Sequence, residues 1–293
     1  MTERRLLVCG AGLMGHGIAQ VCAAAGHEVA LFEPDPERAE AGRARIAGNL
    51  ERSVAKGRLG ADEREAQLAR IRVARTLADG AADATFVVEA VFEDEAVKRA
   101  LLSELDALAP PAVILASNTS SISITRLASV VRPGRRGQVV GMHFFSPVPV
   151  MPLVELVRGE ETGPETEAAV RALAAELDKQ VIASRDRPGF LVNRILMPLL
   201  VEAMRAYEEG TGSAEDIDLG ARLGLNHPMG PLELADFIGL DVCLHIMEVL
   251  EKGLQAPHLT PPEVLRRLVE AGHLGQKTGQ GFYTYPRQPG SAR

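Results

Sequence analysis

Two polar residues interrupt otherwise apolar segments and are candidates for proton-transfer chemistry. His143 follows the apolar run Gln138 to Met142, and Glu155 lies inside the apolar run Leu153 to Val157. A glutamate in an apolar strand is costly unless it faces solvent or has a partner. If the proline-rich loop folds the second strand back beside the first, the carboxylate can orient the imidazole and raise its basicity. This arrangement predicts His143 as a general base oriented by Glu155; the alternative is a structural histidine and a glutamate exposed at a strand edge.

A glycine-rich segment near the start of the chain could bind a diphosphate. Gly10, Gly12 and Gly15 form the pattern GxGxxG between an expected strand, Arg4 to Cys9, and an expected helix, Leu13 to Ala25. The first glycine permits a tight turn, the second lets a diphosphate approach the backbone, and the third lets the helix lie close to the strand. The helix N-terminus adds N–H donors and a partial positive charge. We therefore predict a dinucleotide site that includes Leu13 and Met14; the alternative is an ordinary glycine turn.

An acidic residue, Glu33, ends the next expected strand, Glu28 to Glu33. At that place a carboxylate can accept hydrogen bonds from an adenosine ribose. The same carboxylate would repel a 2′-phosphate, so the sequence favours NAD over NADP. The alternative is a surface glutamate with no ligand.

Five small polar residues, Ser117 to Ser121, follow the expected strand Ala112 to Ala116. Ligands bind at the carboxyl ends of strands in open sheets. These residues could therefore hydrogen-bond a substrate oxygen or a cofactor ribose. They could equally cap a helix that begins near Ile124.

The elements that position these residues alternate between strand and helix through about residue 185. This pattern predicts an α/β fold with a Rossmann-like, doubly wound, mostly parallel sheet in residues 1–187. A charged helical stretch at about 36–71 is expected to project from it as a helical pair. Residues 188–293 are expected to form an all-helical C-terminal domain, with a frayed tail from Pro286. The expected helices there are Leu191 to Glu209, Ala214 to Leu223, Leu232 to Lys252 and Pro262 to Ala271.

Composition excludes several classes of protein. A net charge of −7 and 4% aromatic residues without tryptophan argue against a nucleic-acid-binding protein. The three cysteines form no CxxC pair and fit a reduced, cytoplasmic setting. Leu6 to His27 carries no Lys, Arg, Asp or Glu, but five glycines interrupt it, so we expect no membrane span. No metal site is expected.

Several longer motifs make the chain resemble the short-chain 3-hydroxyacyl-CoA dehydrogenases, especially the bacterial 3-hydroxybutyryl-CoA dehydrogenase type. The resemblance runs in order from the glycine loop to Gly281-Phe282-Tyr283. Besides the glycine loop and the polar run, the matching motifs are His143-Phe144-Phe145, Pro188 to Arg194, Asn226 to Pro231 and Gly275 to Gly279.

The resemblance implies a role for each matching residue at the reaction centre. His143 matches the catalytic base of the family and Glu155 matches its partner. Ser120 matches a serine that hydrogen-bonds the 3-oxygen of the substrate. Asn193 matches an asparagine that helps hold that oxygen and the histidine, which would place the site at the seam of the two domains. Ser146 stands where many members carry asparagine, which weakens any assignment of acyl-chain preference.

The resemblance also implies cofactor and substrate contacts. Glu93 and Lys98 match positions near the nicotinamide and its ribose, and Asn118 lies in a cofactor-contacting motif. An acidic helix N-terminus also accounts for Glu93. Lys56 and Arg52, one helical turn apart in the helical pair, would meet the phosphates of CoA; the alternative is an ordinary solvated helix face.

The activity implied is the NAD-dependent, reversible oxidation of an (S)-3-hydroxyacyl-CoA, with a homodimer formed through the C-terminal domain. One alternative is a β-hydroxyacid dehydrogenase acting on a free acid. Those enzymes use a lysine in the helical domain, and no lysine follows Pro188 before Lys252. A second alternative, a non-catalytic NAD-binding redox sensor, would have no need of the proposed catalytic residues.

Overall fold

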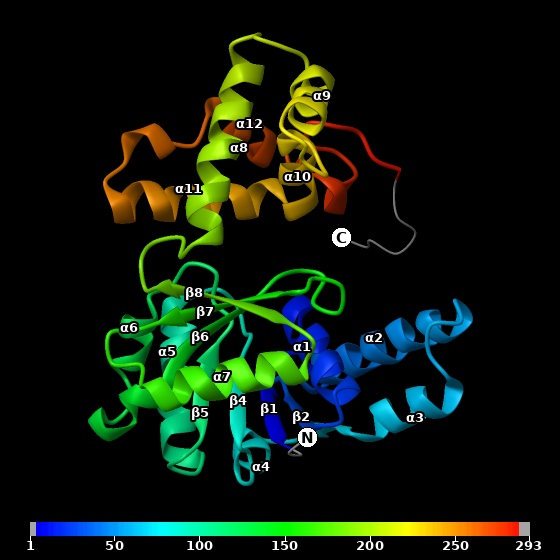
Figure 1. The fold of residues 1–293 in the computed structure, drawn as a ribbon, viewed down its shortest axis with the longest axis vertical. Helices are drawn as coiled ribbons and strands as arrows, with labels where there is room; N and C mark the ends of the chain where they lie inside the picture. Colours follow the sequence, from blue (N-terminus) through cyan, green and yellow to red (C-terminus); the bar gives the residue numbers. More distant parts are fainter. Residues whose placement is uncertain (1–3, 287–293) are drawn as a thin grey trace. The chain divides into compact units, whose positions relative to one another are not determined.

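A single eight-stranded sheet organises the first part of the computed structural model, which describes residues 4–286. The strand order is β3-β2-β1-β4-β5-β6-β7-β8 (Figure 1). Neighbouring strands are parallel except β6 and β7, which pair antiparallel. The strands are β1 Arg5–Cys9, β2 Glu28–Phe32, β3 Ile71–Ala74, β4 Phe86–Glu89, β5 Ile114–Ser117, β6 Val139–Phe144, β7 Leu153–Arg158 and β8 Gln180–Arg185.

Helices flank this sheet, because its central strands are apolar along nearly their whole length. Every residue of β4 and β6 is buried, as expected for strands covered on both faces. The predicted Rossmann-like α/β fold is therefore confirmed. The flanking helices are α1 Leu13–Ala24, α4 Leu77–Ala81, α5 Glu95–Leu108, α6 Ile124–Ala128 and α7 Pro164–Glu176, with a 3₁₀ helix, η1, at Pro133–Gln138.

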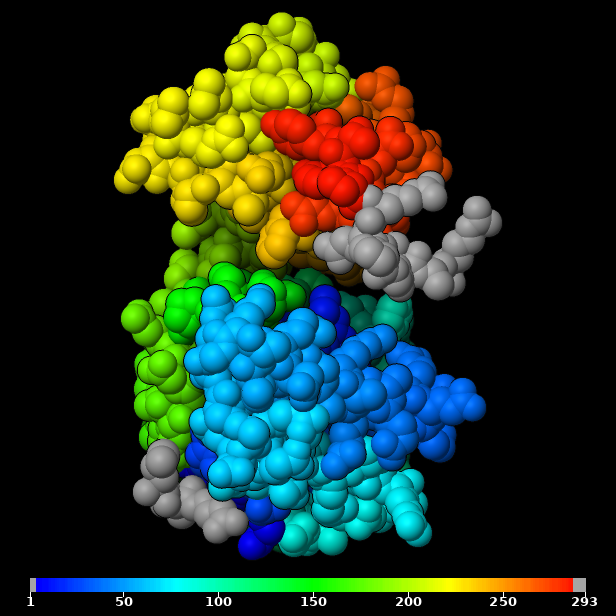
Figure 2. All heavy atoms as spheres, turned by 90° about the vertical axis from the view of Figure 1, so that its right-hand side faces the viewer, coloured from blue at the N-terminus to red at the C-terminus, as the bar shows by residue number. Residues whose placement is uncertain are grey.

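A pair of helices, α2 Pro36–Ala55 and α3 Ala61–Ala69, projects from the sheet (Figure 1). The Asp35 carboxylate caps α2 by accepting hydrogen bonds from the backbone of Glu37 and Arg38. In Figure 2 the pair forms the blue to light-blue surface that faces the viewer. The chain then enters the short strand β3, which the sequence analysis missed.

Contacts divide the chain into two compact units, unit 1 from Met1 to Arg187 and unit 2 from Pro188 to Arg293. In its described part unit 2 is helical, apart from isolated β-bridges among Gly275, Gln280 and Thr284. Its core includes Met197, Leu200 and Met247. The expected tail lies, from residue 287 onward, outside the described residues. The helices are α8 Val192–Glu208, α9 Ala214–Gly224, α10 Pro231–Ile238, α11 Leu240–Leu254 and α12 Glu263–Glu270, with 3₁₀ helices η2 Pro257–Leu259 and η3 Gln276–Thr278.

The prediction of one helix from Leu232 to Lys252 is wrong. Gly239 separates α10 from α11 and has a φ of 106°, a conformation that side-chain-bearing residues rarely adopt. A Cβ at this position would lie 3.1 Å from both Asp241 Oδ1 and Lys277 Nζ. The glycine therefore ends one helix and starts the next.

Within residues 4–286, no helix is long and apolar enough to cross a membrane. The same residues contain no group of three or more His, Cys, Asp or Glu side chains arranged to hold a metal ion.

Candidate active site

His143 and Glu155 face each other across the antiparallel pair β6 and β7. The loop between the strands reverses the chain, and the register places the two residues directly opposite one another. Directly opposed residues present their side chains on the same face of a sheet. His143 Nδ1 lies 3.2 Å from Glu155 Oε2, and both side chains are buried. The structure thus brings together the two residues that the sequence analysis paired.

This contact selects which imidazole nitrogen can accept a proton. In the neutral ring, Nδ1–H donates to the Glu155 carboxylate, so Nε2 is the basic nitrogen. The Phe145 ring packs against the imidazole with the two centroids 4.6 Å apart. The strand and the phenyl ring together fix the orientation of His143.

Asn118 joins the ends of β5 and β6 beside His143. Its Oδ1 accepts a 2.8 Å hydrogen bond from the backbone N–H of Phe144. Asn118, which the resemblance assigns to the cofactor, therefore also binds the backbone of Phe144, the residue that follows His143.

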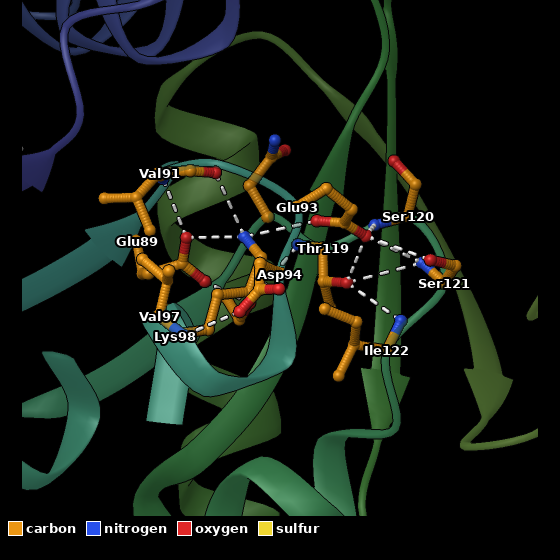
Figure 3. A network of polar contacts seen from close by, with 12 residues as sticks. Glu89, Val91, Glu93, Asp94, Val97, Lys98, Thr119, Ser120, Ser121 and Ile122 are labelled. Carbon is orange, nitrogen blue, oxygen red and sulfur yellow. Dashed lines mark hydrogen bonds and ion pairs between the residues drawn. The ribbon is translucent and has the colours of Figure 1, made fainter. Parts of the chain in front are cut away.

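The polar run Ser117 to Ser121 is organised around the Glu93 carboxylate (Figure 3). Glu93 Oε1 accepts hydrogen bonds from Thr119 Oγ1 at 2.6 Å, Ser120 N at 2.8 Å, and both N and Oγ of Ser121 at 3.1 Å. The alternative that this run caps the next helix is wrong, because the N-cap of α6 is Ser123. The run instead forms a tight loop that presents Ser120, which is half-buried.

A buried ion pair that the sequence analysis missed lies behind this loop. Lys98 Nζ donates to Glu89 Oε1 at 2.6 Å and lies 3.2 Å from Glu93 Oε2. Glu89 and Lys98 are both buried. Burial opposes the charge of Glu93, but Lys98 and the hydrogen bonds from Thr119 and Ser120 hold the pKa of this carboxyl below its ordinary value. Glu93 is therefore ionised at neutral pH.

The three loop glycines have different surroundings. Gly10 has a φ of 101°, and a Cβ there would lie 2.4 Å from the backbone oxygen of Ala90. A Cβ on Gly15 would lie 1.8 Å from the backbone oxygen of Gly10, so helix α1 could not approach β1 so closely. A Cβ on Gly12 would meet nothing within 4 Å. Gly12 is the N-cap of α1, and as a glycine it has no side chain to cap the first backbone N–H groups of the helix.

Glu33 lies at this loop, where its Oε2 accepts a 3.2 Å hydrogen bond from Ala11 N. Its side chain is 11% exposed, so an edge of the carboxylate still reaches solvent. The open backbone at Gly12, the first turn of α1 and this carboxylate fit the diphosphate and ribose of a dinucleotide. Leu13 is exposed at the start of α1, and Met14 follows it half-buried.

Arg52 and Lys56 line one cleft of about 360 Å³ in unit 1. Both are exposed, near the end of α2. The loop from Ser146 to Val150 also lines the cleft, and α1 contributes His16 and Gln20. The cleft thus combines cations with an apolar wall.

Asn193 is the second residue of α8, in unit 2, and its side chain is buried.

Most of the chain matches one family of proteins, in two parts. Residues 5–187 match the family described as 3-hydroxyacyl-CoA dehydrogenase, NAD binding domain. Residues 189–285 match 3-hydroxyacyl-CoA dehydrogenase, C-terminal domain.

Relatives and solved structures agree with this match. The chain is 49% identical over 283 residues to 3-hydroxybutyryl-CoA dehydrogenase of Bradyrhizobium diazoefficiens, covering 96% of this chain and 95% of the relative. It is 47% identical over 285 residues to a probable 3-hydroxybutyryl-CoA dehydrogenase of Bacillus subtilis, covering 97% and 98%. The crystal structure of (S)-3-hydroxybutyryl-CoA dehydrogenase PaaH1 from Ralstonia eutropha superposes with a TM-score of 0.92 at 45% identity, covering 98% of this chain and all of that one.

Proposed function

The chain belongs to the 3-hydroxyacyl-CoA dehydrogenase family, and from this premise we propose that it interconverts (S)-3-hydroxybutyryl-CoA and acetoacetyl-CoA. It is an NAD-dependent oxidoreductase. The short acyl chain and the S configuration are inferred from the names of the relatives, which are 3-hydroxybutyryl-CoA dehydrogenases.

The observation that carries the proposal is the contact between His143 Nδ1 and Glu155 Oε2. When bound, NAD supplies the acceptor for the hydride that leaves C3 of the substrate. Oxidation of the alcohol also releases the hydroxyl proton, and His143 Nε2 accepts it. Glu155 stabilises the resulting imidazolium through Nδ1. In the reverse direction His143 returns the proton to the developing alkoxide.

Ser120 and Asn193 position the 3-oxygen of the substrate. A hydroxyl and an amide can each hydrogen-bond this oxygen as charge develops on it. Ser120 is presented by the loop that Glu93 organises. Asn193 belongs to the first turn of α8.

The cofactor is held at the carboxyl ends of the parallel strands. Gly10, Gly12 and Gly15 with Leu13 and Met14 bind the diphosphate, and Glu33 binds the adenosine ribose. Glu93, Lys98 and Asn118 surround the nicotinamide end. Lys98 is buried and paired with Glu89 and Glu93, so it acts at this end of the site by positioning Glu93 and not as a direct cofactor contact.

The phosphates of CoA bind in the cleft beside α2, where Lys56 and Arg52 are the proposed contacts. A local patch of cations matters for this step, because the chain as a whole carries a net charge of −7.

The proposed assembly is a homodimer through unit 2, in the cytoplasm. Exposed apolar side chains on unit 2, including Ile195, Leu223 and Leu225, support the dimer. The three cysteines are free and buried, which suits a reducing compartment. Light scattering coupled to gel filtration tests the dimer, and a monomer at micromolar concentration would contradict it.

The function is tested by following loss of NADH absorbance with acetoacetyl-CoA. We expect turnover with acetoacetyl-CoA and none with free acetoacetate at the same concentration. Equal turnover of the free acid would favour a β-hydroxyacid dehydrogenase, and no turnover with either would favour a redox sensor. A kcat/KM series from butyryl-length to palmitoyl-length acyl chains tests the short-chain assignment.

A further inference from the structure

Five residues from β4, β5, α5 and the loops that follow the two strands form a closed polar ring, of which Figure 3 labels Glu89, Glu93, Lys98 and Thr119. Ser117 Oγ donates to Glu89 Oε2 at 2.6 Å and accepts from Thr119 N at 3.2 Å. Thr119 Oγ1 donates to Glu93 Oε1, and Glu93 Oε2 pairs with Lys98. Lys98 donates to Glu89 Oε1, which closes the ring. We call these five residues the Glu89 ring.

The ring is built from buried groups that depend on one another. Glu89, Lys98, Ser117 and Thr119 are buried, and the Glu93 side chain is 29% exposed. Lys98 Nζ also lies 3.3 Å from the backbone oxygen of Val91, so three acceptors surround its three N–H donors. A buried ion pair costs desolvation, and removing one partner leaves an uncompensated charge. A change at one member therefore alters the position of the others.

The outer side of the ring holds the loop that carries Ser120. The backbone N–H groups of Ser120 and Ser121 both donate to Glu93 Oε1. Glu93 is in turn held through Lys98 and Thr119, whose positions depend on Glu89 and Ser117. This gives a continuous path of hydrogen bonds and ion pairs from the buried end of β4 to the loop that presents Ser120.

We propose that Glu89 is a positioning residue for the dehydrogenase reaction, acting through the Glu89 ring to hold Ser120 at the 3-oxygen of the substrate. The Glu89 carboxylate accepts hydrogen bonds from Val91 N, Lys98 Nζ and Ser117 Oγ. The proposal rests on the proposed function, because it assigns Ser120 to the substrate oxygen. Small displacements of a positioned group cost large factors in rate, so a buried residue behind the loop can control turnover.

The test is a double-mutant cycle between Glu89→Gln and Ser120→Ala, measured with acetoacetyl-CoA and NADH. We expect Glu89→Gln to lower kcat about tenfold or more, with the KM for acetoacetyl-CoA within about threefold. Ser120→Ala should cost about tenfold in the wild-type background and less than about threefold in the Glu89→Gln background, since Ser120 is then already displaced. Equal costs in the two backgrounds would overturn the proposal.

A second measurement does not depend on activity. Hydrogen exchange of the Ser120 and Ser121 amides should become about tenfold faster in Glu89→Gln than in wild type. Unchanged exchange would contradict the ring as the support of the loop. If the wild type shows no turnover, the proposed function fails, and exchange alone then decides whether the ring holds the loop.

Two further variants separate positioning from general loss of stability. Glu176→Gln is a control at another partly buried carboxylate. Glu176 Oε2 accepts a 2.8 Å hydrogen bond from Arg4 Nε and is not part of the Glu89 ring. This variant should leave kcat and the exchange of both loop amides unchanged. If Glu89→Gln does not fold, Ser117→Ala opens the ring by removing two hydrogen bonds, to Glu89 Oε2 and from Thr119 N, without changing any charge. It should show the same non-additivity with Ser120→Ala, and full additivity would overturn the proposal.

Discussion

The pairing of His143 with Glu155 makes a specific demand on the charge of the carboxylate. Glu155→Gln keeps the shape of the side chain, but its amide can donate to Nδ1 and so favour the tautomer that lacks a lone pair on Nε2. We expect kcat to fall by about 10² to 10⁴. Affinity for NADH should remain within about twofold, because the glycine loop is unaffected. Steady-state kinetics and a fluorescence titration with NADH measure the two quantities.

Two companion variants complete this prediction. His143→Ala should give a folded protein that binds NADH and is inactive, and substantial activity would refute the base assignment. Glu160→Gln, at an exposed glutamate just beyond the end of β7, is the matched control and should keep full turnover. Wild-type turnover in Glu155→Gln would show that the pairing has no role in proton transfer.

At the scale of single residues, the sequence allowed the buried Glu155 to be recognised as a candidate site residue but not the buried Glu89. Glu155 lies inside an apolar run, where a charge requires a partner, so its importance could be inferred. Glu89 ends the short strand β4, where an acidic residue also fits an ordinary solvated strand end. Its partners Lys98 and Ser117 come from α5 and β5, and only the folded sheet brings them together. The only signal in the sequence is that apolar residues, Val88 and Ala90, stand on both sides of Glu89.

At the scale of secondary-structure elements, helix α2 places cations along the cleft proposed for CoA. Lys56→Ala and Arg52→Ala should each raise the KM for acetoacetyl-CoA about three- to tenfold with kcat nearly unchanged, because these contacts are equal in ground and transition states. The effect should shrink as salt screens the phosphates. Arg45→Ala, on an exposed position of α2 outside the cleft, is the control. An unchanged KM in both cleft variants would show that Lys56 and Arg52 lie on an ordinary solvated helix face and do not bind CoA.

The C-terminal end of α5 depends on one buried arginine in η1. The Arg135 guanidinium donates to the backbone oxygens of Asp106, Ala109, Pro110 and Val113 at 3.0–3.2 Å. Arg135→Met removes a donor from each of these carbonyls, although Asp106 O keeps Arg132 Nη2 and Pro110 O keeps Val113 N. We expect a loss of about 2–4 kcal/mol in the free energy of unfolding. Urea denaturation followed by circular dichroism measures it, since the chain has no tryptophan.

The neighbouring residue offers a matched control for this element. The side chain of Arg136 is 31% exposed and pairs with the half-exposed Glu161. Arg136→Met should therefore cost less than about 1 kcal/mol. Equal losses in the two variants would mean that burial of Arg135 contributes nothing beyond its charge.

Elements with strong periodicity were predictable, and elements set by tertiary contacts were not. The alternation of strands and helices correctly indicated the sheet, and the apolar runs located its central strands. Strand β3 contains the charged Arg72 and directly follows the charged helical stretch, so it lacks an apolar run and its pairing with β2 supplies what its sequence lacks. The break between α10 and α11 could not be read from hydrophobic spacing, because it rests on the positive φ of Gly239, which does not interrupt the apolar pattern.

At the scale of the whole molecule, the two units differ in how their carboxyl groups titrate. In unit 1, hydrogen bonding to Arg4 holds the pKa of Glu176 below its ordinary value of 4.5. Burial would raise the pKa of Glu93, but Lys98 and the hydrogen bonds from Thr119 and Ser120 together lower it below the same ordinary value. In unit 2, burial raises the pKa of Asp236 above its ordinary value of 3.8, despite hydrogen bonds from Tyr283, Phe282 and Tyr285.

Acid should therefore weaken unit 1 before it weakens unit 2. A carboxyl whose pKa is lowered by folding stabilises the protein above its ordinary pKa, and this contribution is lost as the pH falls through the folded value. Asp236 has the opposite sign, so its contribution grows as the pH falls towards 3.8. As the pH falls below about 4.5, the ordinary pKa of Glu176 and Glu93, hydrogen-exchange protection corrected for pH should fall in unit 1 and hold in unit 2. Glu176→Gln should flatten the decline in β1 and α7, and an equal decline in both units would contradict this assignment of the titrating groups.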